Sequence, residues 1–108
     1  MRCLIVFATV SVVISVLTNP VSAEYCEQQN KELIGHVQEV VDASDVAVCK
    51  DLCGNSQTEF GFECKSGMFY LNDADQNCLL NSESEHSQPD LFVDAPEDYP
   101  VIYFDDHC

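Results

Sequence analysis

Positive charge is nearly absent from this 108-residue sequence, which contains four Lys and Arg residues against nineteen Asp and Glu residues. The formal net charge at pH 7 is −15. Nucleic acids and heparin-like sulfated polysaccharides are polyanions, and proteins bind them by displacing counterions with clustered Lys and Arg side chains. The scarcity of cations therefore excludes both as ligands. It favours a basic protein, or diffusely held divalent cations, as the partner.

A second long hydrophobic run is also missing. The single run, Cys3–Leu17, follows the positive residue Arg2 and precedes small residues that end at Ala23. It is shorter than the roughly twenty residues that a membrane-spanning helix needs, and its flanks are typical of a cleaved signal peptide. We expect residues 1–23 to be this peptide and residues 24–108 to be a single secreted domain without membrane insertion. Asn-x-Ser/Thr is absent as well, so no N-linked glycan is expected.

An even number of cysteines remains once residues 1–23 are removed. The mature chain then has three lysines and nineteen carboxylates, a net charge of −16. Six cysteines in such a short secreted chain are typical of a disulfide framework. They are Cys26, Cys49, Cys53, Cys64, Cys78 and Cys108.

A short helix is predicted at the centre of the chain. Ser44 and Asp45 can cap its start, and Gly54 stands where helices often end in a left-handed residue. Cys49 and Cys53 are four residues apart, which places both thiols on one face of this helix. We therefore expect each of them to bond to a cysteine elsewhere in the chain.

Most of the other segments are predicted to be strands. In residues 33–41, β-branched residues favour a strand over a competing helical spacing. A polar turn at residues 54–57 is followed by alternating apolar residues, Phe60, Phe62 and Cys64, which predict a half-buried strand. After a turn at Ser66-Gly67, further strands are expected at residues 68–71, 78–80 and 101–104.

Residues 82–98 differ from the rest in being acidic, proline-containing and poor in apolar residues. Long loops in small domains are usually functional or mobile. We interpret this segment as a long acidic loop that extends into solvent, with an interaction loop as the alternative.

Six cysteines allow fifteen connectivities, and the spacing alone does not select one. A bond between Cys26 and Cys108 would restrain both ends of the domain. The helix cysteines Cys49 and Cys53 would then pair with Cys64 and Cys78, in either a nested or a crossed arrangement.

The helix carrying Cys49-Lys50-Asp51-Leu52-Cys53, followed by Met68-Phe69-Tyr70 and Cys78-Leu79-Leu80, resembles the PAN/apple domain in its six-cysteine version. This resemblance implies an α+β fold in which one short α-helix packs on an antiparallel β-sheet. It also implies nested disulfides, which join Cys26 to Cys108, Cys49 to Cys78 and Cys53 to Cys64.

Catalytic and metal-binding patterns are not found. Asp73–Asn77 superficially matches the start of a calcium-binding EF-hand loop, but Cys78 replaces its Gly and Ser84 stands where a bidentate Glu is required. With the thiols committed to disulfides, no catalytic cysteine or Cys/His zinc pattern remains. The three histidines, His36, His86 and His107, are far apart in the sequence, so we expect them to be surface residues. We expect no metal site, no cofactor and no enzymatic activity.

Aromatic residues remain as candidates for binding. Phe side chains should fill the core, whereas a tyrosine ring with its polar hydroxyl suits an exposed recognition patch. We select Tyr70, Tyr99 and Tyr103. The resemblance implies a non-catalytic recognition module that binds an extracellular protein or carbohydrate. The alternative is an acidic structural component of an extracellular matrix or coat.

Overall fold

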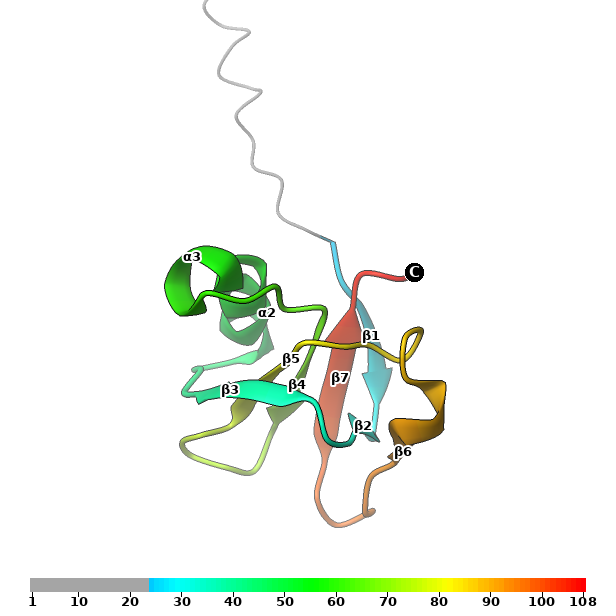
Figure 1. Ribbon diagram of the computed structural model, residues 1–108. Coiled ribbons are helices and arrows are strands. Elements are labelled where there is room, and N and C mark those ends of the chain that lie inside the picture. Colours follow the sequence, from blue (N-terminus) through cyan, green and yellow to red (C-terminus); the bar gives the residue numbers. More distant parts are fainter. Residues whose placement is uncertain (1–23) are drawn as a thin grey trace, which may run out of the picture.

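The computed structural model describes residues 24–108 (Figure 1), and the predicted signal peptide lies outside the described residues. The elements are, in chain order, β1 (Cys26–Gln29), β2 (Lys31–Leu33), β3 (Val37–Val41), α2 (Val46–Gly54), α3 (Ser56–Phe60), β4 (Ser66–Tyr70), β5 (Cys78–Asn81), the 3₁₀ turn η1 (Pro89–Leu91), β6 (Phe92–Asp94) and β7 (Val101–Asp105).

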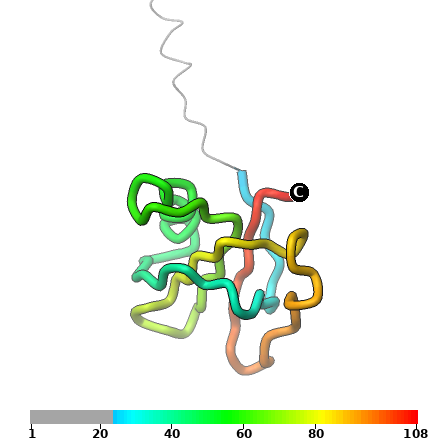
Figure 2. Tube along the Cα trace, viewed as in Figure 1, coloured from blue at the N-terminus to red at the C-terminus, as the bar shows by residue number. Residues whose placement is uncertain are grey.

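The strands form a five-stranded antiparallel sheet in the order β1-β7-β4-β5-β3, and β2 and β6 form a separate antiparallel ribbon. The C-terminal strand β7 lies inside the sheet, between β1 and β4. The two ends of the domain therefore lie side by side, as the blue and red segments in Figure 2 show. This architecture confirms the predicted α+β fold with an antiparallel sheet and one main helix.

The sheet is covered on both faces. Successive side chains of a strand point to opposite faces, so Phe69 and Phe104 pack with the cysteines of α2. Their neighbours Met68 and Tyr103 pack on the other side with Leu33, which belongs to the β2–β6 ribbon. All five residues of β4 are consequently buried. A strand buried on both faces leaves no side chain for contact with solvent.

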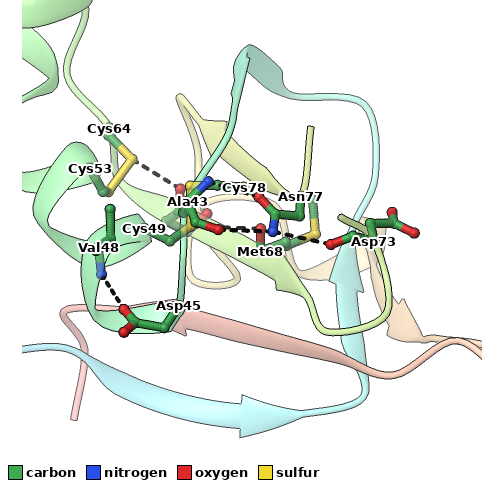
Figure 3. The surroundings of a disulfide bond; sticks show 11 residues. Ala43, Asp45, Val48, Cys49, Cys53, Cys64, Met68, Asp73, Asn77 and Cys78 are labelled. Carbon is green, nitrogen blue, oxygen red and sulfur yellow. Dashed lines mark hydrogen bonds between the residues drawn. A yellow bond between two sulfur atoms is a disulfide. The ribbon is translucent and has the colours of Figure 1, made fainter. Parts of the chain in front are cut away.

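Asp45 is the N-terminal cap of α2, in agreement with the prediction. Its carboxylate accepts a hydrogen bond of 3.0 Å from the backbone N–H of Val48 (Figure 3). α2 ends at Gly54, where the sequence placed its end, but Gly54 does not adopt the expected left-handed conformation, because α3 follows directly after Asn55. The left-handed residue is Gly61, with φ +83°, whose N–H donates to the first turn of α3.

The predicted strand at residues 60–64 and the polar turn at residues 54–57 are also wrong. Residues 56–60 form α3, because the backbone N–H of Glu59 donates to the carbonyl oxygen of Asn55, and the N–H of Gly61 donates to the first turn of α3. Phe60, the last residue of α3, and Phe62, which follows it, still pack against the helix-side core. Ser66-Gly67 is not a turn but the beginning of β4.

Two longer segments are also divided differently from the prediction. Residues 33–41 do not form one strand, because the chain leaves β2 at Leu33, turns at Gly35 and enters β3 in the other sheet. Residues 82–98 contain η1 and β6, and Leu91 and Phe92 pack against the core. The interpretation of this whole segment as a solvated loop is therefore wrong, since part of it covers one face of the sheet.

Candidate binding surface

Three disulfides hold the layers together. Cys26 is bonded to Cys108, Cys49 to Cys78 and Cys53 to Cys64. The second bond joins α2 to β5, and the third joins the same helix to the segment that leads into β4 (Figure 3). One face of the helix is thus crosslinked twice to chain segments that follow it. We expect a rigid scaffold from which the loops project.

The buried side chain of Asn77 anchors the β4–β5 loop. Its Oδ1 accepts from the N–H of Ala43 and its Nδ2 donates to the carbonyl oxygen of the same residue, both at 2.9 Å (Figure 3). The amide thereby holds the end of the loop against the segment that enters α2. Asn77, which the sequence places in an EF-hand-like stretch, has this structural role.

The three selected tyrosines do not form an exposed patch. Tyr103 is completely buried and Tyr70 is 7 % exposed, because β7 and β4 are covered on both faces. Selecting these two as surface residues was wrong, since both rings belong to the core beneath the β2–β6 ribbon. Tyr99 is 39 % exposed, and its ring lies 5.2 Å from that of Tyr70, centroid to centroid.

The Tyr103 hydroxyl connects the segment after β5 to strand β7. It donates to Oδ2 of Asp105 at 2.7 Å and accepts from the N–H of Glu85 at 2.8 Å. Burial, assisted by the hydrogen bond to Asp105, raises the pKa of Tyr103 above its ordinary value. The hydroxyl therefore stays protonated and bridges residues 82–88 to the end of β7.

Replacing Tyr103 by Phe should destabilise the domain by about 1 to 3 kcal/mol, because a buried N–H and a buried carboxylate oxygen each lose a partner. Urea unfolding monitored by circular dichroism measures this change. Tyr99→Phe is the matched control: its hydroxyl bonds to Asp73 at an exposed position, so we expect a loss below about 0.5 kcal/mol. Equal stabilities of the two variants would contradict this role of Tyr103.

Two loops meet at the end of the domain where Tyr99 lies. The Tyr99 hydroxyl donates to Asp73 at 2.6 Å, and the N–H of Leu71 donates to the carbonyl oxygen of Pro100. The Leu71 side chain is 49 % exposed. We call this surface the loop end; it consists of residues 71–75 and 97–100, and its exposed carboxylates are Asp75, Glu97 and Asp98.

A second feature is an open depression of about 340 Å³ near the C-terminus. The rings of His86 and His107 stack there with centroids 3.8 Å apart. The sequence separates these histidines by 21 positions, and no local pattern indicates that they meet. The other residues that line the depression are Glu63, Lys65, Ser84, Ser87 and Asp106.

Fold and surface together define a small disulfide-crosslinked α+β domain whose conspicuous surface features lie on loops. The PAN domain family matches residues 24–108, and the chain belongs to this family. The predicted family is thereby confirmed. PAN domains are non-catalytic modules that bind proteins or carbohydrates.

A protein of Caenorhabditis elegans is similar in sequence to the chain. The chain is 41 % identical over 76 residues to the "Uncharacterized protein F52C9.5" of Caenorhabditis elegans. The match covers 70 % of this chain but 12 % of that protein. No solved structure matches the chain. Among residues 24–108, no helix has the length and apolar character needed to cross a membrane.

Proposed function

We propose that the protein is a secreted, non-catalytic recognition module that binds a basic surface of an extracellular protein through the loop end. The observation that carries this proposal is the exposure of Tyr99 and Leu71 on two adjoining loops that also carry exposed carboxylates. Aromatic residues in such positions commonly dominate binding energy at protein interfaces.

The charge of the domain supports a cationic partner. Two of its three lysines are engaged in ion pairs, Lys31 with Asp94 and Lys50 with Glu27. Most of the remaining surface charge is therefore unopposed carboxylate. A Lys or Arg of a partner could place its charged group among these carboxylates while its aliphatic stem packs on the Tyr99 ring. The charged group could equally lie over the face of this ring.

The scaffold supports recognition because the disulfides limit the motion of the elements that carry the loops. Residues 71–75 continue directly from the fully buried strand β4, and residues 97–100 lead into β7. A loop held in this way loses little conformational entropy when it binds. The disulfides also suit an oxidising extracellular compartment.

Binding of the oxidised protein to a panel of extracellular proteins and glycans tests the proposal. We expect saturable binding to a basic protein that weakens as salt is added. Tyr99→Ala should lower the affinity by about tenfold or more, as truncation of a central aromatic residue does. Val48→Ala is the control, because Val48 is an exposed apolar residue on α2, and its affinity should be unchanged.

Three results would contradict the proposal. One is saturable binding to a glycan that salt does not affect. The second is equal affinity of the Tyr99→Ala and wild-type proteins for the basic partner. The third is loose, non-saturable association with many cationic surfaces, which would favour the acidic matrix or coat component.

A further inference from the structure

Two carboxylates and an imidazole converge next to the depression near the C-terminus. The ligand atoms of Glu85, His86 and Asp105 all lie within 4.8 Å of one another. Glu85 and His86 belong to the segment after β5, whereas Asp105 is the last residue of β7. The fold therefore brings together three metal-ligating side chains from two segments that are distant in sequence.

Neighbouring groups orient both carboxylates. Asp105, 3 % exposed, accepts from the Tyr103 hydroxyl through Oδ2 and from the N–H of His107 through Oδ1. Glu85 accepts through Oε1 from the side-chain amide of Gln28 at 2.8 Å. A carboxylate oxygen has two lone pairs, so each group retains an acceptor position after these bonds form. Hydrogen bonds of this kind orient the ligands in metal sites.

The charges of the cluster are not neutralised by the protein. Within residues 24–108, neither Glu85 nor Asp105 takes part in an ion pair. Two like charges this close repel each other, and the burial of Asp105 reduces the screening by water. A bound cation would remove the repulsion, and Asp105 is too buried to turn away from Glu85.

We propose that Glu85, His86 and Asp105 bind one divalent transition-metal ion of the zinc type. An imidazole nitrogen suits Zn²⁺, whereas Ca²⁺ and Mg²⁺ prefer sites made of oxygen alone. Bonds of roughly 2.0 to 2.2 Å place tetrahedral ligands about 3.5 Å apart. Ligand atoms at the 4.8 Å limit must therefore approach by about an ångström, which small movements of the half-buried Glu85 and the exposed His86 supply.

The surroundings of the cluster fit an open coordination position. His86 also lines the depression of about 340 Å³, which gives water access to an ion bound at this place. His107 lines the same depression, and its ring stacks on that of His86. This site is separate from the loop end, so the metal proposal does not depend on the proposed function.

Titration of the chelator-treated, oxidised protein with ZnCl₂ in a calorimeter tests the proposal. We expect one saturable site, above any weak and diffuse binding by the acidic surface. His86→Ala should weaken this site by about tenfold or more, because one of three protein ligands is lost. His36→Ala is the matched control, since His36 is neither in the cluster nor at the depression, and it should leave the affinity unchanged.

Glu85→Gln provides a second variant that keeps the shape of the side chain. Its amide oxygen can still accept from Gln28, but the negative charge of the ligand is lost. We expect Glu85→Gln to bind zinc more weakly than the wild type. The control Glu59→Gln, at an exposed position on α3, should bind zinc as tightly as the wild type. Absence of a saturable site, or equal losses in the cluster variants and their controls, would overturn the proposal. Circular dichroism without metal establishes that each variant is folded.

Discussion

Gly67→Ala should destabilise the domain by about 2 to 3 kcal/mol, the range expected for overpacking a filled core. Gly67 lies opposite Phe104 in the β4–β7 pairing, and the Phe104 ring covers it. A β-carbon at this position would lie 2.9 Å from both Cε atoms of the ring and closer still to Cζ. The ring cannot move away, because Phe104 is completely buried against the helix layer. Thermal or urea unfolding measures the loss.

Gly54→Ala is the control for this prediction. Gly54 lies in the last turn of α2, and an added β-carbon would make only an ordinary contact, 3.6 Å from the Tyr25 hydroxyl. Ala is favoured over Gly in a helix by up to about 1 kcal/mol. We therefore expect Gly54→Ala to be neutral or stabilising. A Gly67→Ala protein as stable as Gly54→Ala would show that the core around Phe104 can rearrange.

Replacing both Cys49 and Cys78 by Ala should cost about 3 to 4 kcal/mol, since a crosslink that closes a loop of this length restricts the unfolded chain by that amount. The bond spans 29 residues, and both cysteines are completely buried. Small domains have modest cores, so a loss of this size is a large part of the total stability. We expect the variant to be partly or wholly unfolded at 37 °C by circular dichroism.

The Cys53–Cys64 bond offers a comparison within the same helix. It spans only 11 residues, so replacing this pair should cost about 1 kcal/mol less than replacing the longer crosslink. Denaturant unfolding of the two double variants gives the difference. A larger loss for the Cys53→Ala/Cys64→Ala protein would contradict the view that loop length determines the ranking.

Local sequence signals predicted the elements whose structure depends on local interactions. Asp45 caps the helix because its side chain reaches an N–H three residues away, which needs no tertiary contact. The apolar runs before Leu71 and after Pro100 form β4 and β7 for a similar reason, because their residues favour strands. The predicted strand at residues 60–64 failed because alternating apolar residues fit a strand, whereas the chain there ends the helix α3 at Phe60, with the left-handed Gly61 as its cap.

The site residues were harder to predict, because exposure depends on what lies above a strand. Tyr70 and Tyr103 would have been exposed if the sheet had one solvent face, and the β2–β6 ribbon covers that face. His86 and His107 are exposed, as expected, but their separation in the sequence did not indicate that they meet. They are stacked because β7 ends beside the segment that follows β5.

The sequence by itself determined the acidic character, the parity of the cysteines and the helix with Cys49 and Cys53 on one face. These follow from composition and from the period of the helix, which are properties of neighbouring residues. Only the tertiary structure decided that Tyr99 is exposed while Tyr103 is buried, and that Glu85, His86 and Asp105 meet. Burial and long-range proximity depend on how layers pack, and packing joins residues whose separation in sequence carries no information about their distance in space.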